Sequence, residues 1–410
     1  MGGFFCYGNK MMNDTKTSHV MATYNRSKLR FERGDGAWLT TDTGDQYLDF
    51  GSGIAVNVLG HSHPKLVATL QAQAEKLWHV SNLYTIPEQE ALADALCATS
   101  FADAVFFCNS GAEAAEGMIK VMRKYHAAHG HDEKVTLISF AGAFHGRTLA
   151  ALAAAGNSAY LKGFGPAPEG FVQCPEFTIE AVEALIDDTT AGILIEPVQG
   201  EGGVRDVGTA FLRDLRALCD KHEILLGLDE VQCGIGRTGK LFAHEWAEIS
   251  PDVMAIAKAI GGGFPLGAFL TTQALGAVMQ PGTHGSTYGG GPLAMAVGKA
   301  VLDTVNDEEF LQHVRDISNY FRQQLSQLVD ENPDIFTQVR GRGLLSGLQC
   351  KPMNTDVVAA LRAHKLLSVG AGENTIRLLP PLNVTREEVG IAIDALRAAC
   401  VDLRKPSTEA

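Results

Sequence analysis

The chain is short of positive charge. Its 410 residues include 34 lysines and arginines against 47 aspartates and glutamates, which gives a net charge of −13. A surplus of negative charge repels the phosphates of nucleic acids and of anionic membranes. We therefore expect neither nucleic acid nor a membrane as a partner. Small anionic substrates stay compatible, because single arginines can bind them.

The chain also lacks paired cysteines and long apolar runs. Its eight cysteines are scattered without a Cys-x-x-Cys pair, which predicts reduced thiols in the cytoplasm and neither disulfides nor a zinc site. His61 and His63 have no neighbouring cluster of acids or histidines, so we expect loop histidines and no metal. No run of about 20 apolar residues is free of charge and proline, so no membrane span is expected. The start lacks the basic and apolar regions of a secretory leader, and we expect residues 1–18 to be extended or disordered.

What the chain does contain is a regular alternation of strand-like and helical segments. Apolar runs at 105–108, 135–140, 191–196 and 224–229 predict strands, and patterns at 112–128 and 210–222 predict helices. This order is typical of an α/β fold whose mostly parallel sheet is covered by helices on both faces. Ligands of such folds bind at the carboxyl ends of the strands.

The last quarter of the chain has a different pattern. Long helices are predicted at 307–331 and 386–404, and strands at 340–350 and 375–379. This pattern indicates a smaller α+β domain, which hairpins within residues 28–50 could join. We expect an N-terminal segment over 19–60 that joins the small domain, a large domain over 61–300, and the small domain over 301–410.

Lys258 is the most informative single residue. It is the lone charge in the apolar segment 253–260, and three glycines follow at 261–263. Such a lysine tends to have a depressed pKa, and its neutral amine can attack a carbonyl to form a Schiff base. Upstream, an apolar strand ends in Asp229, a carboxylate that could hold a protonated pyridine nitrogen. The two suggest pyridoxal 5′-phosphate (PLP) chemistry; the alternative is a lysine whose stem lies along an apolar helix while its amine reaches water.

Two motifs follow other predicted strands. Ser110, Gly111 and Ala112 open a helix, where backbone N–H groups can bind a phosphate, although Ser110 could simply cap the helix. Phe144 could stack on a cofactor ring, and Arg147 could hold a carboxylate through two parallel hydrogen bonds. A packed phenylalanine and a surface arginine are the alternative.

A glycine motif invites a competing interpretation. Gly234, Gly236 and Gly239 match the dinucleotide-binding pattern G-x-G-x-x-G. However, Asp229 and Glu230 would repel a pyrophosphate, and the segment predicts a turn instead of the start of a helix. Dinucleotide binding is therefore disfavoured.

Two further segments are ambiguous alone. The polar, glycine-rich loop 285–290 could reach a phosphate or a substrate, or be only a flexible loop. Arg377 lies within a predicted strand, where it could face solvent or bind a carboxylate.

Together, the motifs resemble those of the class III PLP-dependent aminotransferases, and among these the acetylornithine aminotransferases. The resemblance covers residues from about 22 to about 403. The motifs that carry it lie at 77–84, 109–113, 144–148, 196–203, 229–232, 258–263 and 285–290. The resemblance implies PLP-dependent transferase fold type I, with a mostly parallel seven-stranded sheet in a large domain and a smaller α+β domain.

The resemblance implies the residues that bind the cofactor ring. Lys258 would hold PLP covalently and later move a proton. Asp229 would pair with the pyridine nitrogen, Gln232 would contact the phenolic oxygen, and Phe144 would stack on the ring.

It also implies how the phosphate is held. Gly111 and Ala112 would bind it through backbone N–H groups, with Ser110 nearby. Thr287 would reach the phosphate of the neighbouring subunit, which implies a homodimer with shared active sites.

The implied substrates are amino acids and 2-oxo acids. The terminal amine of N2-acetyl-L-ornithine would move to 2-oxoglutarate in arginine biosynthesis, giving N-acetylglutamate 5-semialdehyde and glutamate; N-succinyldiaminopimelate could be a further donor. Arg147 and Ser286 would contact acetylornithine, Arg147 at its α-carboxylate. Arg377 would bind the α-carboxylate of glutamate, with Arg147 on the distal one. Glu201 would pair with Arg377 when glutamate is absent, because an unpaired buried guanidinium is costly.

Alternatives remain at two levels. Within the class, the donor could be succinylornithine, ornithine or 4-aminobutyrate; outside it, the chain could be a PLP-dependent decarboxylase or a non-catalytic PLP-binding protein. The chain departs from the family pattern at Gly291, Ala112 and Ala115, which replace a common Asn, Thr and Asn. Since neither Lys258 nor Asp229 is affected, we expect activity.

Overall fold

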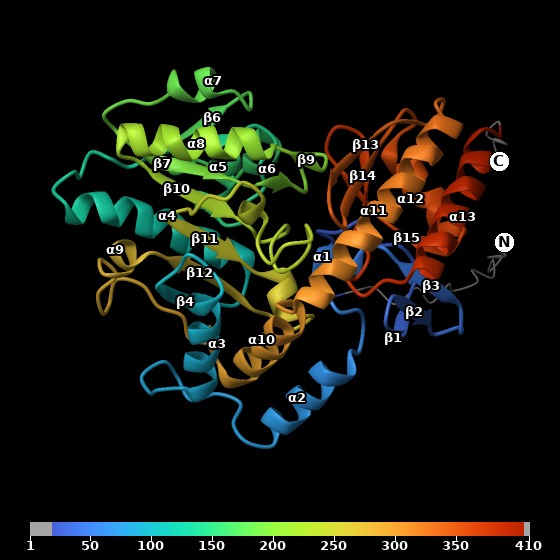
Figure 1. The fold of residues 1–410 in the computed structure, drawn as a ribbon, viewed down its shortest axis with the longest axis horizontal. Coiled ribbons are helices and arrows are strands. Elements are labelled where there is room, and N and C mark those ends of the chain that lie inside the picture. Colours follow the sequence, from blue (N-terminus) through green and yellow to red (C-terminus); the bar gives the residue numbers. More distant parts are fainter. Residues whose placement is uncertain (1–18, 406–410) are drawn as a thin grey trace, which may run out of the picture.

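A seven-stranded sheet lies at the left of the molecule in Figure 1, with the strand order β4-β12-β11-β10-β7-β5-β6. The computed structural model describes residues 19–405, so the extended start expected at 1–18 lies outside the described residues. The strands of this sheet are β4 (Ala104–Cys108), β5 (Thr136–Phe140), β6 (Phe171–Cys174), β7 (Thr190–Ile195), β10 (Leu225–Asp229), β11 (Val253–Ile256) and β12 (Gly267–Thr271). All neighbours run parallel except β12, which is antiparallel to β11 and β4. The predicted mostly parallel sheet is confirmed.

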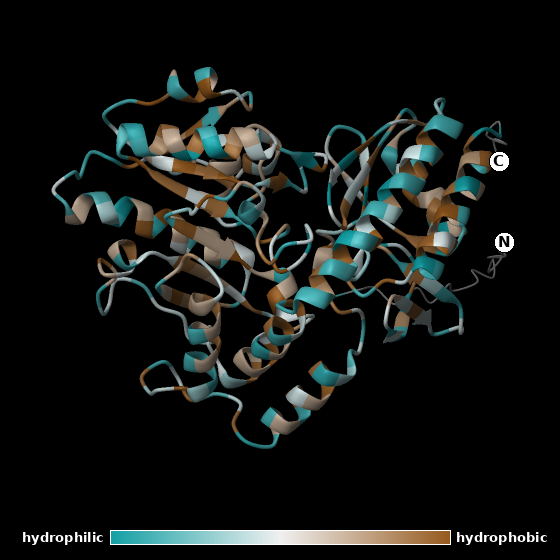
Figure 2. Ribbon diagram, viewed as in Figure 1, coloured by the Kyte–Doolittle hydropathy of each residue, from teal (hydrophilic) through white to brown (hydrophobic). Residues whose placement is uncertain are grey.

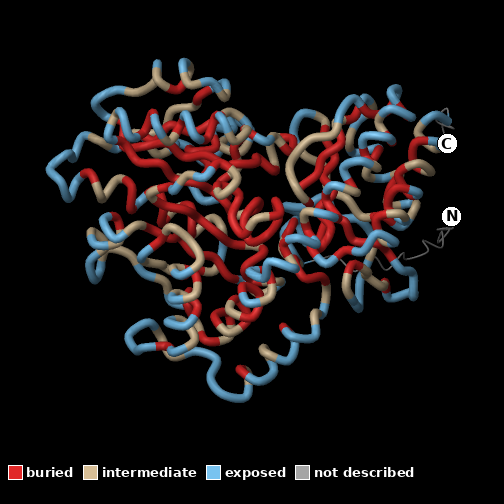
Figure 3. The backbone as a smooth tube through the Cα atoms, in the orientation of Figure 1, coloured by how far each residue is buried: buried red, intermediate tan, exposed pale blue. Residues whose placement is uncertain are grey.

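Helices cover both faces of this sheet because its strands are apolar on both sides. In β7, Leu194 belongs to an apolar cluster with Met118 of α4 (Gly111–Ala128). Its neighbour Ile193 belongs to a second cluster with Leu215 of α8 (Thr209–His222). Since successive side chains of a strand point to opposite faces, α4 and α8 lie on opposite sides of the sheet. The strands are accordingly brown in Figure 2 and red in Figure 3.

Two smaller sheets lie at the right of Figure 1. One has the order β1-β2-β3-β15 and the other β13-β14-β17-β16. Their strands are β1 (Phe31–Asp35), β2 (Trp38–Thr41), β3 (Gln46–Asp49), β13 (Phe336–Arg342), β14 (Leu345–Cys350), β15 (Leu366–Leu367), β16 (Val369–Ala371) and β17 (Thr375–Leu378). Because β3 pairs in parallel with β15, the N-terminal hairpins do join the C-terminal elements. The domain boundaries near residues 60 and 300 stay a prediction.

One predicted strand is wrong in its extent. The segment 340–350 is not a single strand: it contains the end of β13, a turn and all of β14, and the two strands pair antiparallel. Gly341 and Gly343 have φ of 87° and 61°, which glycine adopts without strain. These two residues let the chain reverse.

The remaining helices and short elements connect these sheets. They are α1 (Ser52–Ala55), α2 (Pro64–Ala74), α3 (Pro87–Ala98), α5 (Leu149–Ala155), α6 (Ser158–Leu161), α7 (Ile179–Glu183), β8 (Val198–Gln199), β9 (Arg205–Asp206), α9 (Gln273–Gly276), α10 (Pro292–Val305), α11 (Glu308–Glu331), α12 (Asn354–Ala363) and α13 (Arg386–Leu403), with 3₁₀ turns at Ala243–Trp246 and Lys258–Gly261. Within residues 19–405, no helix is both long and apolar enough to cross a membrane.

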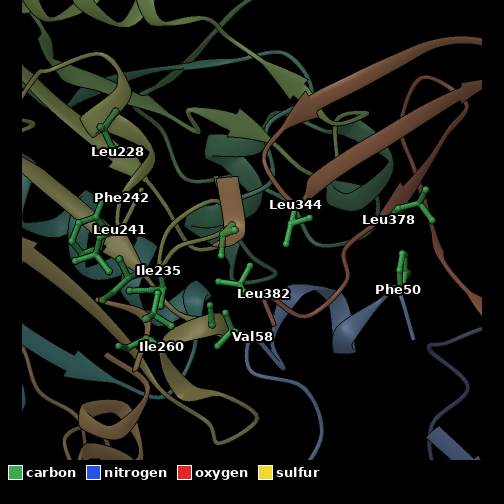
Figure 4. Packing of buried hydrophobic residues seen from close by; sticks show 14 of the residues in the cluster. Phe50, Val58, Leu228, Ile235, Leu241, Phe242, Ile260, Leu344, Leu378 and Leu382 are labelled. Carbon is green, nitrogen blue, oxygen red and sulfur yellow. The ribbon is translucent and has the colours of Figure 1, made fainter. Parts of the chain in front are cut away.

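An apolar cluster runs without a break from the large sheet to the C-terminal elements (Figure 4). Leu228 of β10 and Leu378 of β17 are both completely buried members of it. Each lies next to a charged residue, Asp229 and Arg377. Packing of the cluster therefore fixes where these two charges lie relative to each other.

Candidate active site

A cavity of about 470 Å³ lies at the carboxyl edge of the large sheet, where ligands of parallel sheets bind. It is lined by Val56, residues 109–112 and 144–147, Glu196, Glu201, Asp229, Val231, Gln232, Ala257, Lys258 and residues 263–266. Most of these segments follow β4, β5, β7, β10 and β11 in turn. Every predicted site residue lines this cavity except Ser286, Thr287 and Arg377.

Lys258 enters the cavity directly after β11. Its φ is 48°, a left-handed conformation that side-chain-bearing residues rarely adopt, and it begins the 3₁₀ turn. Burial lowers the pKa of Lys258, and the positive charge of Arg377 lowers it further. A larger part of the lysine therefore carries the neutral amine that can attack a carbonyl. The alternative of an amine in water on a helix is wrong.

Asp229 ends β10 and is almost fully buried. One carboxylate oxygen accepts the backbone N–H of Val231 at 3.0 Å, and the other lies 2.8 Å from Nδ1 of His145. Burial disfavours a charged imidazole, but the hydrogen bond and charge of Asp229 outweigh it and raise the pKa of His145. Nε2 of His145 has no hydrogen-bond partner among residues 19–405.

Glu196 adds a second buried carboxylate at the end of β7. It accepts the backbone N–H of Phe144 at 3.0 Å. Burial raises the pKa of Glu196 to about 7, against the attraction of His145. Neither Glu196 nor His145 was predicted as a site residue, although both stand inside motifs that the sequence singled out. A buried acid directly after an apolar strand was the available signal.

The predicted phosphate turn is the N-terminus of α4. Ser110 caps the helix, because its hydroxyl oxygen accepts the backbone N–H of Glu113 at 3.3 Å. Two glycines let the surrounding segments approach. A Cβ at Gly111 would lie 2.7 Å from Val231, and one at Gly146, whose φ is 134°, would lie 2.7 Å from Ala112. The helix end presents free N–H groups toward the cavity, where an anion is favoured.

Arg377 of β17 reaches the edge of the cavity from the C-terminal sheet. Its guanidinium is buried, and Nη2 lies 2.8 Å from a carboxylate oxygen of Glu201. Nη1 donates to the side-chain oxygen of Gln232 at 3.3 Å. Nε has no partner within the described part of the chain. Glu201 and Arg377 thus form an ion pair at the edge of the cavity.

Arg147 has a different environment. Its guanidinium carbon lies 4.0 Å from the ring centre of Tyr160 and 5.5 Å from that of Phe144. Its side chain is exposed, and no hydrogen bond or ion pair joins it to any residue between 19 and 405. All of its N–H donors are therefore open to a ligand.

Ser286 and Thr287 lie on a loop outside the cavity of their own chain. Asn82 donates its side-chain amide to the carbonyls of Ser286 and Gly289 at 3.0 and 2.9 Å. The Ser286 hydroxyl accepts the backbone N–H of Gly289 at 2.9 Å. Thr287 is exposed.

The glycine motif at 234–239 does not begin a helix. It forms a turn in which Arg237 is completely buried and donates to the carbonyls of Leu344 and Pro380. Burial lowers the pKa of Arg237 to about 9. The motif joins the large sheet to the C-terminal elements and does not line the cavity. Between residues 19 and 405, no three histidines, cysteines or acids are grouped so that they could hold a metal ion.

Comparison with known proteins identifies the family. The model of the family "Aminotransferase class-III" matches residues 20–400. The chain belongs to this family.

Its relatives share nearly the whole length. It is 56% identical over 389 residues to an acetylornithine aminotransferase of Brucella melitensis, covering 95% of this chain and 96% of that protein. The crystal structure of N-acetylornithine aminotransferase from Stenotrophomonas maltophilia superposes with a TM-score of 0.81 at 36% identity, covering 93% and 97% of the two chains. The ornithine aminotransferase of Toxoplasma gondii superposes with a TM-score of 0.90 at 30% identity, covering 94% and 93%. The chain is a PLP-dependent aminotransferase of fold type I.

The residues of the cavity fit this cofactor. PLP needs an amine for covalent attachment, an acid for its ring nitrogen and donors for its phosphate. Lys258 has a lowered pKa, Asp229 is buried, and α4 begins with free N–H groups at a turn where two glycines let the neighbouring segments pack closely. The residues at the carboxyl edge of the large sheet are therefore the ones that would hold PLP in this chain.

Proposed function

We propose that the protein transfers the terminal amine of N2-acetyl-L-ornithine to 2-oxoglutarate, a step of arginine biosynthesis that gives N-acetylglutamate 5-semialdehyde and glutamate. The observation that carries this proposal is the pair of unlike arginines: Arg147 has open donors, whereas Arg377 is held by Glu201. The names of the curated relatives, acetylornithine aminotransferases at 53–56% identity, support the same donor.

The two substrates place different demands on the cavity. Acetylornithine carries its carboxylate far from the reacting amine, whereas glutamate carries one carboxylate next to it and another further away. Arg147 would bind the distal carboxylate of both. Arg377 would bind only the α-carboxylate of glutamate, so it must be covered during the acetylornithine half-reaction. Glu201, 2.8 Å away, would cover it and turn aside when glutamate arrives.

The remaining residues would act on the cofactor. PLP supplies the electron sink that makes the proton on the amine-bearing carbon removable. Nζ of Lys258 would hold PLP and then take and return that proton, which its lowered pKa favours. Asp229 would accept a hydrogen bond from the ring nitrogen, and His145 would keep this acid oriented. Gln232 would contact the phenolic oxygen, Phe144 would stack on the ring, and Ser110, Gly111 and Ala112 would hold the phosphate.

The active protein would be a homodimer with shared sites. Trp78, Leu83, Tyr84 and Tyr288 are 65–86% exposed, an unusual cost in water unless another surface covers them. The hydrogen bonds of Asn82 join their two segments into one surface, which we call the aromatic patch (residues 77–84 and 285–290). Thr287, on this patch, would reach the phosphate in the cavity of a second copy, and Ser286 would contact its donor.

A location in the cytoplasm is the expected setting. The seven described cysteines are unpaired, which a reducing compartment maintains.

A half-reaction screen tests the donor. Purified holoenzyme is mixed with acetylornithine, succinylornithine, ornithine, 4-aminobutyrate and N-succinyldiaminopimelate, and conversion of the cofactor from its aldehyde to its amine form is followed by absorbance. We expect acetylornithine to have the highest second-order rate constant for this half-reaction. Equal rates with ornithine and 4-aminobutyrate would contradict the narrow assignment. Release of carbon dioxide would indicate a decarboxylase, and an unchanged spectrum with every donor a non-catalytic protein.

A further inference from the structure

Arg147 is oriented by rings and not by an acid. Its guanidinium carbon lies 4.0 Å from the ring centre of Tyr160, closer than to Phe144 at 5.5 Å. The two rings are themselves nearly perpendicular, at 88° with centres 6.5 Å apart. A guanidinium on the face of an aromatic ring is attracted by the ring's negative face. The contact leaves every N–H donor of Arg147 without a hydrogen-bond partner among residues 19–405, so these donors stay available.

An acidic partner would behave differently. The carboxylate of Glu201 uses donors of Arg377, so a substrate must displace it before it can bind there. A ring face uses none of the donors of Arg147. It restricts the side chain without competing with the carboxylate of the substrate, which reduces the entropy lost on binding.

The backbone is built to bring Tyr160 to this place. Helix α5 ends at Gly156, whose φ is 64° and where an added Cβ would lie 2.4 Å from the side chain of Gln173. The next turn, α6, is capped by Asn157, whose side chain accepts the backbone N–H of Ala159 at 3.0 Å. The chain therefore reverses sharply after α5, and Tyr160 returns over the segment that holds Arg147.

We propose that Tyr160 is a positioning residue that holds Arg147 by stacking and thereby sets the preference for amine donors with a distal carboxylate. This inference rests on the proposed function, in which Arg147 binds that carboxylate. Tyr160 itself does not line the cavity. Loss of its ring should weaken binding of the distal carboxylate and leave the chemistry at the amine unchanged.

The test compares two donors that differ only in the carboxylate. N-Acetyl-1,4-diaminobutane is acetylornithine without its α-carboxylate, so Arg147 has nothing to bind in it. Holoenzyme variants Tyr160→Leu and Tyr160→Met should raise KM for acetylornithine about 3- to 10-fold, with kcat within twofold. The value of kcat/KM for N-acetyl-1,4-diaminobutane should not change. Tyr160→Phe, which keeps the ring face, should match the natural protein.

A double-mutant cycle separates stacking from a general structural effect. In an Arg147→Met background, Tyr160→Leu should produce no further loss, because the residue that it positions is gone. Equal losses with both donors, a full additional loss in the Arg147→Met background, or a defect in Tyr160→Phe as large as in Tyr160→Leu would each overturn the proposal.

A wrong donor assignment can be distinguished from a wrong role for Tyr160. If the natural protein prefers another donor, the same cycle is run with that donor and its decarboxylated analogue, for example ornithine and 1,4-diaminobutane. The coupling between Tyr160 and Arg147 is then measured independently of the acetylornithine assignment.

Discussion

Buried charge is concentrated around Lys258. Within one cavity lie the acids Asp229 and Glu196, the imidazole of His145 and the amine of Lys258, and all are largely removed from water. Burying an isolated charge is expensive, so such groups shift their pKa or pair with each other. Both responses occur here: Asp229 pairs with His145, and Glu196 shifts.

Glu196 should make stability depend on pH. Its pKa in the fold is about 7, against 4.5 ordinarily, so the folded state favours the protonated acid. The stabilising contribution is therefore complete below about pH 4.5 and is lost as the pH rises through 7. Replacing Glu196 by Gln removes the titrating group and keeps an oxygen for the N–H of Phe144. In cofactor-free protein, we expect Glu196→Gln to be more stable than the natural protein at pH 8, by about 1–3 kcal/mol, and to lose this advantage at pH 5.

Melting temperatures at the two pH values measure this difference. Glu180→Gln, at an exposed glutamate, is the control and should follow the natural protein at both. An equal effect of Glu196→Gln at pH 5 and pH 8 would show that this acid does not titrate in the window.

Glu201 should set the balance between the two half-reactions. Glu201→Gln keeps the size of the side chain but removes the charge that neutralises Arg377. Since a charge-assisted hydrogen bond contributes about 1.5–3 kcal/mol, the ratio of the acetylornithine rate to the glutamate rate should fall by about 10- to 100-fold. Single-turnover absorbance with each donor gives the ratio.

The matched control is Glu373→Gln. Glu373 also pairs with arginines, Arg340 at 2.5 Å and Arg205 at 3.6 Å, but its side chain is 43% exposed and does not line the cavity. An exposed ion pair contributes little, so the ratio should stay the same. If Glu201→Gln also left the ratio unchanged, Glu201 would not cover Arg377.

At this scale, the sequence predicted the residues with unusual local surroundings. Lys258 and Asp229 could be found because each breaks an apolar run. His145 and Glu196 were missed as site residues, because their partners are set by the fold: His145 and Asp229 are 84 positions apart in the chain. The stacking of Arg147 on Tyr160 likewise depends on the bend after α5.

Among the elements, the contact between α4 and β12 constrains the position of the predicted phosphate turn. Gly117 of α4 faces Phe269 of β12, and an added Cβ would lie 2.3 Å from the ring. Phe269 is buried and stacks on Phe106 of β4 at 5.2 Å, so it cannot withdraw easily. The helix whose N-terminus would hold the cofactor phosphate is thus set against the sheet by a glycine.

We expect Gly117→Ala to destabilise the protein by about 1–3 kcal/mol, because it overpacks this contact. It should also weaken retention of PLP, since α4 carries the phosphate turn. Gly390→Ala in α13 is the matched control. Nothing lies within 4 Å of the Cβ it would add, and alanine in a helix should stabilise by up to about 1 kcal/mol.

Thermal unfolding and the cofactor absorbance retained after dialysis measure the two effects. If Gly117→Ala were as stable as Gly390→Ala, the Phe269 ring would be able to shift away from the added methyl group with little loss of stability.

The elements with strong periodicity were predicted well. The pattern at 112–128 became α4, and the apolar run at 224–229 became β10. Strand direction was not predictable, because an apolar strand such as β12 has the same pattern whether it runs parallel or antiparallel. The hairpin in 340–350 was missed since glycines inside a strand pattern can mark either a bulge or a reversal.

For the whole molecule, the aromatic patch bears on whether one chain can form a complete active site. It exposes large apolar side chains beside Thr287, and Thr287 does not line the cavity of its own chain. From the sequence, the proposed second copy followed only from the family resemblance. The fold brings residues 77–84 and 285–290 together on one exposed surface, and the sequence alone does not show this.

Leu83→Glu should break the dimer and with it the activity. Leu83 is 86% exposed, so the change costs little in the isolated chain, but a buried unpaired carboxylate would be expensive in an interface. Met353→Glu, at a methionine that is 62% exposed outside the patch, is the control and should stay dimeric and active. Light scattering and turnover are measured together. A fully active Leu83→Glu monomer would contradict the shared site.

Combining two inactive variants in one dimer gives a sharper test of whether the two subunits share each active site. Lys258→Ala lacks the reactive amine, and Thr287→Glu would repel the phosphate in the neighbouring cavity. In a mixed dimer of the two, one site has an intact Lys258 from one chain and an intact Thr287 from the other. Co-expression should therefore restore up to half of the activity per mixed dimer, because the second site carries both lesions. If Thr287 served its own chain instead, each mixed dimer would carry one lesion in each site, and no activity would return.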